Sequence, residues 1–278
     1  MQLLTHSAAT RRMSALPRTL FVALAARAQG AKAFPSMDPQ DRHAATMLQA
    51  SGAEVQTSAA DHPTVMNVLW RTRLIKQMGE AFFEHRPRST GVNLGAGLAH
   101  YFQWLDNGSN HWIDVDLPEV ITLRDTLLPK LPARCQHKAL DLTQPGWWKR
   151  LGLQHHREPV LLVCEGVLMY LQPAQVRTFL REIGEHAPEG SELLCDFMSP
   201  VGVGHSALDH VPGHETAAFT WGAHNGMELA SAHPRLELLS QHSASEALGW
   251  AGALNDMLWT PWVGGPLYGL AQLRVSDD

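Results

Sequence analysis

The chain has 278 residues, with 22 Lys and Arg residues against 27 Asp and Glu residues, and a formal net charge of −5. Hydrophobic residues make up 45% of it and charged residues 18%, which is the profile of a folded globular protein. The acidic balance argues against a nucleic-acid partner, because binding to a phosphate backbone depends on an excess of cations. The three cysteines (Cys135, Cys164 and Cys195) form no Cys-x-x-Cys pair, so we expect no disulfide scaffold and a reducing, cytoplasmic location.

The first apolar stretch, residues 20–26, ends at Arg27 and is too short to cross a bilayer, which takes about 20 helical residues. The basic residues upstream of it resemble the charged start of a secretory signal. We favour a core helix, since Leu20, Leu24 and Ala28 are four residues apart and Arg27 can fall outside that stripe. We therefore expect no membrane association.

From about residue 90 onward, short apolar runs alternate with helical patterns, which is typical of parallel β-α-β units in an open twisted sheet. The runs predict strands at 90–94, 111–115, 136–140, 159–164 and 191–197, and a helix at 173–187. Two more strand-like runs, 235–241 and 267–275, follow with no clear pattern of a long helix between them.

We expect the chain to form effectively one domain. Residues 89–278 are predicted to form the α/β core, and residues 1–88 a mostly helical extension or cap. The segment 199–232 is rich in Gly, His and Pro, which favours an inserted lid over a part of the core.

The first predicted strand ends in Gly95-Ala96-Gly97. Two glycines let the backbone turn tightly and remove the Cβ atoms that would block a ligand lying across the turn. Ligands of open α/β sheets bind at the carboxyl ends of the strands. Asp116 ends the second predicted strand, about 20 residues past the glycine turn, where a carboxylate can accept hydrogen bonds from the ribose hydroxyls of a nucleoside.

The pattern favours S-adenosylmethionine as this nucleoside. A dinucleotide motif requires a third small residue where this sequence has His100, and it normally opens its domain. S-adenosylmethionine needs a glycine-lined slot for its amino-acid end, a carboxylate for its ribose and no phosphate cradle. Glu165 follows the fourth predicted strand, and Asp141 with Leu142 follows the third, so we expect both at the same crevice, with Asp141 facing an adenine edge.

Three segments of the chain resemble a known family, and they are Val92 to Leu98, Trp112 to Ile121 and Glu165 to Leu171. Together with residues 19–28, 41–44, 71–73, 195–197 and 219–222, they are similar, in order, to the leucine carboxyl methyltransferase family. Within it, they resemble most the bacterial tetracenomycin-type polyketide O-methyltransferases. The resemblance implies a Rossmann-like class I methyltransferase sheet, mostly parallel, of seven strands with an antiparallel last strand.

The resemblance also implies an activity and roles for individual residues. The expected reaction is S-adenosylmethionine-dependent methyl transfer to a carboxylate or hydroxyl of a small molecule, such as a polyketide-type metabolite. Arg71 is expected to reach the carboxylate of the cofactor, for which the fork of an arginine is well suited. The other implied cofactor contacts are Gly95 and Gly97 at the methionine end, Asp116 at the ribose, Asp141 and Leu142 at adenine, and Glu165 at the floor of the pocket.

The chain departs from the family pattern directly after the glycine turn. Relatives usually continue with Asp-Thr-Arg, whereas this chain has Ala99-His100-Tyr101. A salt bridge or cofactor contact made by that Asp or Arg is therefore missing or replaced. A fold that binds the cofactor and has lost turnover stays open as an alternative for this reason.

The catalytic residue and the acceptor stay open too. A carboxylate acceptor is ionised at pH 7 and needs no base, whereas a phenol would need one. The predicted lid offers four histidines as bases, His205, His210, His214 and His224. The same histidines suggest a metal-dependent hydrolase, but Val211-Pro212-Gly213 breaks a helix between two of them and supplies no catalytic Glu, so we expect no metal.

Four tryptophans in the second half of the chain are candidates for an apolar acceptor pocket or for the core. They are Trp221, Trp250, Trp259 and Trp262. Nothing in the sequence indicates the oligomeric state.

Overall fold

The computed structural model describes residues 18–53, 62–205 and 218–277. At its centre lies a seven-stranded sheet of order β3-β2-β1-β4-β5-β7-β6. The strands are β1 (Thr90–Leu94), β2 (His111–Asp116), β3 (Cys135–Ala139), β4 (Val160–Cys164), β5 (Glu192–Met198), β6 (Leu236–Ser243) and β7 (Tyr268–Val275). Strands β1 to β5 pair in parallel, and β7 runs antiparallel to both β5 and β6. The predicted fold class and its antiparallel last strand are therefore confirmed.

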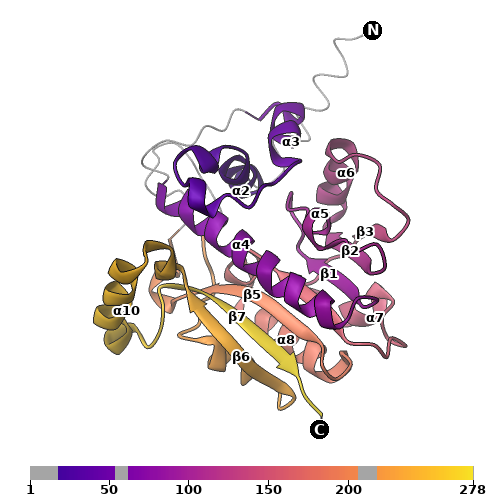
Figure 1. The fold of residues 1–278 in the computed structure, drawn as a ribbon. Helices are drawn as coiled ribbons and strands as arrows, with labels where there is room; N and C mark the ends of the chain where they lie inside the picture. Colours follow the sequence, from indigo (N-terminus) through magenta and orange to yellow (C-terminus); the bar gives the residue numbers. More distant parts are fainter. Residues whose placement is uncertain (1–17, 54–61, 206–217, 278) are drawn as a thin grey trace.

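Helices cover both faces of this sheet (Figure 1). Helices α4 (His62–His85) and α5 (Phe102–Leu105) pack on one face, and α7 (Trp147–Leu151) and α8 (Pro173–His186) pack on the other. All five residues of β4 are buried, as its continuous apolar run requires of a strand covered on both faces. The apolar stripe predicted for residues 173–187 lies buried on α8 and forms much of the second layer.

Local signals explain where several helices begin. Helix α6 (Pro118–Leu127) begins at Pro118, whose fixed backbone suits a first helical turn. Helix α8 begins in the same way at Pro173, and Gln172 with Gln175 forms a capping box around it. Both helices start just beyond loops at the carboxyl ends of strands, so these signals also shape the edge at which the site lies.

Two short helices near the start of the described chain, α2 (Arg18–Gln29) and α3 (Ala44–Ser51), share a small core with α6 and with Leu98. Helix α4 falls inside the predicted 1–88 extension but packs directly on the sheet. The boundary between an extension and a core at residue 88 stays a prediction. In the described part of the chain, no helix is both long and apolar enough to cross a membrane.

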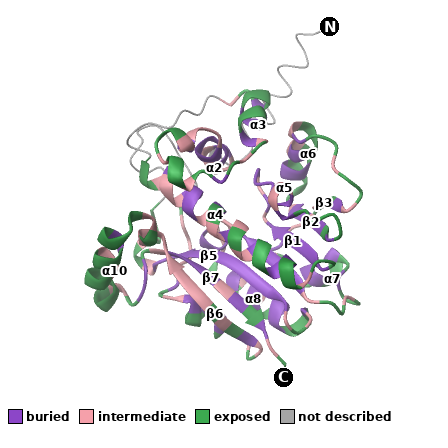
Figure 2. Cartoon of the chain, viewed as in Figure 1, coloured by how far each residue is buried: buried purple, intermediate pink, exposed green. Residues whose placement is uncertain are grey.

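The connection between β6 and β7 differs from the expectation. We expected no long helix there, and the structure places η6 (Ala244–Leu248) and the 14-residue helix α10 (Trp250–Val263). The helix is mostly apolar and contains Pro261, so its sequence has only a weak amphipathic period that would reveal it. Figure 2 shows α10 exposed along most of its length at one side of the molecule.

Candidate cofactor site

A cavity of about 350 Å³ lies at the carboxyl ends of β1 and β4. The loop after β1 and the loop after β4 form its floor, and helices α2 and α4 contribute to its walls. The described residues that line it are Thr19, Leu20, Val22, Ala23, Arg27, Thr64, Asn67, Val68, Arg71, Gly95, Ala96, Gly97, Leu98, Ala99, Glu165, Gly166, Met169, Tyr170, Met198, Phe219 and Tyr268. Four of the predicted cofactor residues, Arg71, Gly95, Gly97 and Glu165, are among them.

The glycine turn needs its glycines for two reasons. Gly95 and Gly97 have φ angles of 72° and 49°, a left-handed conformation that L side chains rarely adopt. A Cβ on Gly95 would also collide with the side chain of Val167, which packs against it from the loop after β4. The turn therefore brings bare backbone to the edge of the cavity.

Arg71 lies at the centre of a buried polar cluster, which we call the Arg71 cluster and which comprises Arg71, Glu165, Asp196, Tyr268 and Tyr101. Arg71 Nε donates to Glu165 Oε1 at 2.6 Å, and Nη1 donates to Asp196 Oδ2 at 3.1 Å and to the hydroxyl of Tyr268. The hydroxyl of Tyr268 donates to Asp196, and that of Tyr101 donates to Glu165 Oε2. These residues come from α4, β5, β7 and the loops after β1 and β4.

Strand register explains why the two carboxylates meet. Cys164 at the end of β4 pairs with Cys195 within β5, so Glu165 and Asp196 follow them side by side. The backbone N–H of Gly166 donates to Asp196 Oδ1 at 2.7 Å, which links the two loops. A buried carboxylate pair of this kind is stable only with a cation between its members, and Arg71 supplies it.

The electrostatics of the cluster are set by burial and by Arg71. Burial works to raise the pKa of Glu165, but Arg71, Arg27 and the Tyr101 hydroxyl outweigh it and hold that pKa below its ordinary value. For Asp196, burial prevails over Arg71, and the pKa is raised. With both carboxylates ionised, the cluster carries a net charge of −1.

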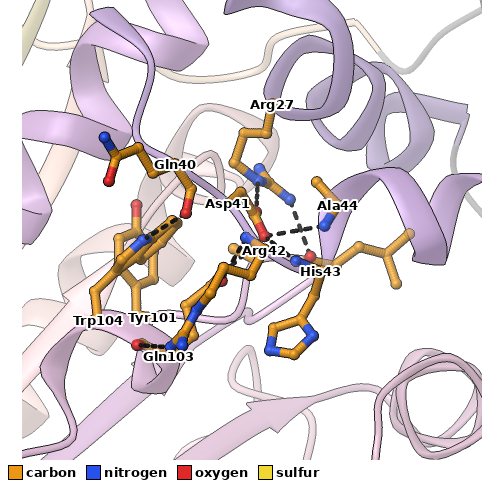
Figure 3. Close-up of polar contacts among 12 residues, drawn as sticks. Arg27, Gln40, Asp41, Arg42, His43, Ala44, Tyr101, Gln103 and Trp104 are labelled. Carbon is orange, nitrogen blue, oxygen red and sulfur yellow. Dashed lines mark hydrogen bonds and ion pairs between the residues drawn. The ribbon is translucent and has the colours of Figure 1, made fainter.

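Arg27 does not fall outside the stripe of α2, so that expectation was wrong. Its side chain is buried, with Nε on Asp41 Oδ2 at 3.0 Å and Nη2 on the carbonyl of Leu98 at 2.9 Å. In Figure 3, Asp41 lies between Arg27 and the backbone that starts α3, and Gln103 donates to its other oxygen. The ion pair provides the polar partners that a buried arginine needs, and it fastens α2 and α3 to the loop beyond the glycine turn.

A second buried arginine, Arg124, donates hydrogen bonds to the backbone of the glycine turn. Arg124 Nη2 donates to Asp114 Oδ2 at 2.6 Å, and Nη1 donates to the carbonyls of Gly97 at 2.8 Å and Ala99 at 2.6 Å. Both side chains are fully buried. We call Arg124, Asp114 and the groups around them the Arg124 cluster, and its contacts point to a structural role in shaping the turn.

The residues of the altered family pattern join these two clusters. Tyr101 belongs to the Arg71 cluster through its bond to Glu165. His100 is buried, with Nδ1 4.0 Å from Asp114 Oδ2, and burial outweighs that carboxylate and lowers the pKa of His100 to about 4. A neutral imidazole and a phenol hydroxyl thus occupy two of the positions at which the chain departs from the expected family pattern.

The predicted ribose and adenine residues lie along the same sheet edge but do not line the cavity described above. Asp116 accepts hydrogen bonds from the backbone N–H groups of Gly97 and Leu117, each at 2.7 Å, and burial raises its pKa. Asp141 accepts from the backbone and hydroxyl of Thr143, and Leu142 is buried in the core. Their roles toward a cofactor stay predictions.

The remaining candidates are placed as follows. His210 and His214 lie outside the described residues, while His205 and His224 do not line the cavity, and His224 is hydrogen-bonded to the carbonyl of Val263. Within the described ranges, no group of three or more His, Cys, Asp or Glu could hold a metal ion. Trp221 is half-buried against the core, whereas Trp250, Trp259 and Trp262 are exposed on α10 and belong to neither core nor cavity.

Sequence reasoning missed Asp196 and Tyr268 as site residues. Asp196 carried a usable signal, because it is a carboxylate at the end of a predicted strand adjacent to the one that precedes Glu165. Tyr268 carried none, since an aromatic residue at the start of an antiparallel strand is ordinary in any sheet. Its hydroxyl reaches Asp196 because Tyr268 pairs with Met198, two residues further along β5.

Comparisons with known proteins agree with this geometry. The sequence is similar to the tetracenomycin polyketide synthesis O-methyltransferase TcmP of Streptomyces glaucescens, with 28% identity over 165 residues, which is 59% of each chain. It is also similar to the S-adenosyl-L-methionine-dependent methyltransferase dpfgK of Gibberella zeae, with 27% identity over 182 residues and 60% of each chain. The matched regions thus span about three fifths of the length of these curated relatives.

Among solved structures, a candidate methyltransferase from Thermobifida fusca YX shares the fold with a TM-score of 0.52 and 16% identity, over 93% of this chain and 94% of that one. The family model for leucine carboxyl methyltransferases matches residues 4–184, which is more than half of the chain. The glycine turn and strands β1 to β4 lie within the matched residues. The chain belongs to the leucine carboxyl methyltransferase family.

Proposed function

We propose that this protein is an S-adenosylmethionine-dependent O-methyltransferase that acts on a small molecule. The observation that carries the proposal is the Arg71 cluster, which faces the glycine turn across one cavity. Membership of a methyltransferase family and the named activities of TcmP and dpfgK support it.

The charge of the Arg71 cluster suits the amino-acid end of the cofactor. S-adenosylmethionine carries a carboxylate, an ammonium and a sulfonium, so its net charge is +1. This charge complements the net charge of −1 that Arg71, Glu165 and Asp196 carry when both carboxylates are ionised. The contacts described for Arg71 use Nε and Nη1, while Nη2 lies against Gly166. Nη2 can therefore reach a ligand carboxylate, and Glu165 can accept a hydrogen bond from the ammonium.

The nucleoside end is proposed to follow the sheet edge from the glycine turn to Asp116. Gly97 and Asp116 are joined by a hydrogen bond, so the turn and this carboxylate form one continuous surface. A carboxylate accepts up to about four hydrogen bonds, and Asp116 therefore keeps capacity for two ribose hydroxyls beside its two backbone partners. Asp141 and Leu142, one strand further along, are proposed to lie beside adenine.

Methyl transfer from a sulfonium is an in-line displacement that depends chiefly on alignment and on the exclusion of water. Met169, Tyr170, Met198 and Phe219 give the cavity an apolar wall against which an acceptor can be aligned. We propose a carboxylate as the acceptor, because a carboxylate is ionised at pH 7 and needs only to be aligned, without a general base.

The test is a methyl-transfer assay with S-adenosylmethionine labelled in its methyl group and matched acceptor pairs. Each pair has one apolar skeleton, once with a carboxylic acid and once with a phenol. We expect label in a base-labile methyl ester at a rate that is independent of pH above the pKa of the acid. Cofactor binding without transfer to either acceptor of any pair would contradict the proposed activity and favour a fold that has lost turnover.

We also propose a reducing, cytoplasmic location. All three cysteines are free and buried, and a reducing compartment keeps thiols in that state. Titration of the purified, denatured chain with a thiol reagent should find three free thiols without prior reduction.

A further inference from the structure

Helix α10 presents an apolar surface to solvent that the fold itself does not use. Of its 14 residues, Asp256 is the one that carries a charge and Gly252 is the one that is buried. Trp250 is 83% exposed and Trp262 is 86% exposed. A contiguous exposed patch of large apolar side chains normally marks a contact with another surface, because its burial removes apolar area from water.

The helix is nevertheless firmly built into the molecule. Gly252 lies so close to the carbonyl of Ser245 that a Cβ has no room, which packs the first turn of α10 onto η6. At the other end, Gly264 caps the helix in a left-handed conformation, and His224 Nδ1 is 2.8 Å from the carbonyl of Val263. Both ends are therefore fixed, and the exposed side chains between them are held in a defined position.

We propose that α10 is the interface of a homodimer, in which it packs against α10 of a second copy around a two-fold axis. The available area is sufficient for this. With about 3.6 residues per turn, Trp250 and Trp262 share one half of the helix with Leu254, Met257 and Leu258, whereas Trp259 lies opposite Trp250. The two tryptophans of this half expose on the order of 400 Å², since an aromatic side chain of this size has up to about 250 Å² to bury. The other three residues bring the patch to the roughly 800 Å² per partner of a stable interface.

The composition of α10 favours a second copy over a lipid surface. Helices that lie on membranes carry Lys and Arg on their polar face, and α10 has neither, while the chain as a whole has a net charge of −5. An uncharged apolar patch needs no complementary charge on its partner, so the same patch on another copy matches it under two-fold symmetry. Tryptophans are also the residues that most often dominate such interfaces.

The interface would lie next to the cofactor site in the chain. Five residues after α10 ends at Val263, the chain reaches Tyr268, whose hydroxyl contacts both Arg71 and Asp196. Leu267, which lies between them in the chain, is also exposed. Pairing of two α10 helices would therefore steady the segment that positions Tyr268.

The test is analytical ultracentrifugation of the full chain from nanomolar to high micromolar concentration. We expect a particle of twice the 30.7 kDa chain mass at the upper end of this range. Trp250→Glu and Trp262→Glu should each raise the dimer dissociation constant by at least about 30-fold, the effect of losing one dominant interface residue. Trp250→Ala is the milder second variant, and unchanged far-ultraviolet circular dichroism and melting temperature show that each variant folds.

The matched control is Leu117→Glu, which places the same charge on a side chain that is 40% exposed. Leu117 follows β2, and four strands separate β2 from β6 in the sheet. This variant should dimerise like the wild type. A wild-type chain that stays monomeric at every concentration, a dimer that survives both Trp→Glu variants, or co-sedimentation of the chain with phospholipid vesicles would each overturn the proposal.

Discussion

The Arg71 cluster and the Arg124 cluster are both built on an arginine-carboxylate ion pair, but they differ in position. Arg71 lines the cavity, whereas Arg124 does not. In both, a buried arginine meets carboxylates near the carboxyl edge of the sheet. Arg124 directs Nη1 and Nη2 at Asp114 and at the carbonyls of the glycine turn, and its side chain is fully buried, so these contacts lie inside the protein. Arg71 lines the cavity, and we propose that its Nη2, which lies against Gly166, binds the ligand carboxylate. In this protein, the ion pair of Arg71 is the candidate binding site because a cavity borders it. The ion pair of Arg124 is a structural support because protein surrounds it.

The largest effect should come from the Arg124 cluster. Arg124→Ala leaves Asp114 buried without its cation and the carbonyls of the glycine turn without a donor. We expect it to lower the free energy of unfolding by about 3–5 kcal/mol, the usual cost of breaking a buried pair. Urea denaturation followed by circular dichroism measures this. A loss below 1 kcal/mol, within the range of ordinary surface substitutions, would remove the structural role.

Arg71 should instead act on the cofactor. Arg71→Ala removes a charged donor from the proposed carboxylate contact, so we expect S-adenosylmethionine to bind about 2 kcal/mol more weakly, roughly 30-fold. Arg71→Lys should recover part of this, because it keeps the charge and loses the fork.

Adenosine provides the internal control for this pair of variants. It lacks the methionine end and should bind the wild type, Arg71→Ala and Arg71→Lys alike. If adenosine binding falls as much as S-adenosylmethionine binding does, Arg71 supports the shape of the pocket and does not touch the cofactor carboxylate.

Asp114 and Asp116 lie two residues apart on β2, so they allow a structural carboxylate and a proposed cofactor-binding carboxylate to be compared within one strand. Asp116→Ala should weaken cofactor binding by about 1–3 kcal/mol, the range for hydrogen bonds to a charged group, and leave the fold intact. Asp114→Asn should lower stability first, since Asp114 is held by Arg124, Trp112 and Asn93. Calorimetric titration and urea denaturation of both variants separate the effects. Unchanged affinity in Asp116→Ala would argue against the ribose role.

The gentlest effect per step is a pH dependence of stability, of which His100 in the Arg124 cluster is the expected source. Burial lowers the pKa of His100 from 6.5 to about 4, against the attraction of Asp114 and with the repulsion of Arg124. The unfolded chain therefore binds more protons between these values, and stability should fall as the pH drops from about 6.5 to about 4, by on the order of 1 kcal/mol per pH unit. Above pH 6.5 this contribution is flat.

His100→Gln removes the titrating ring and should flatten that slope. Denaturation midpoints at a series of pH values test this. The neighbouring His137 works in the opposite direction, since hydrogen bonds to Asp114 and Asp125 overcome burial and raise its pKa. An equally steep slope in His100→Gln would show that other groups control the acid limb.

Much of the fold followed from local pattern. Strands such as β4 are continuous apolar runs, and Pro118 and Pro173 begin helices where their fixed backbone suits a first turn. What local pattern could not provide was α10, since this mostly apolar helix has only a weak amphipathic period. Its tryptophans fitted a pocket or a core equally well, and their exposure depends on tertiary packing.

The site residues also fall into those that local sequence pattern predicts and those that it does not. Gly95, Gly97 and Glu165 were predictable because each stands at the carboxyl end of a recognisable strand, and the structure brings them to one cavity with Arg71. Arg27 was wrongly expected outside its stripe, because its partner Asp41 lies 14 residues away and no periodicity connects the two. Tyr268 depends on the pairing of β7 with β5, which the sequence does not encode locally.

The central claim is that the cavity beside the Arg71 cluster binds S-adenosylmethionine. Isothermal titration calorimetry of the wild-type chain with S-adenosylmethionine, its demethylated product and NAD tests this most directly. The account predicts micromolar dissociation constants for the first two ligands, and binding of NAD that is much weaker or undetectable. Binding of NAD that is tighter than that of S-adenosylmethionine would contradict it.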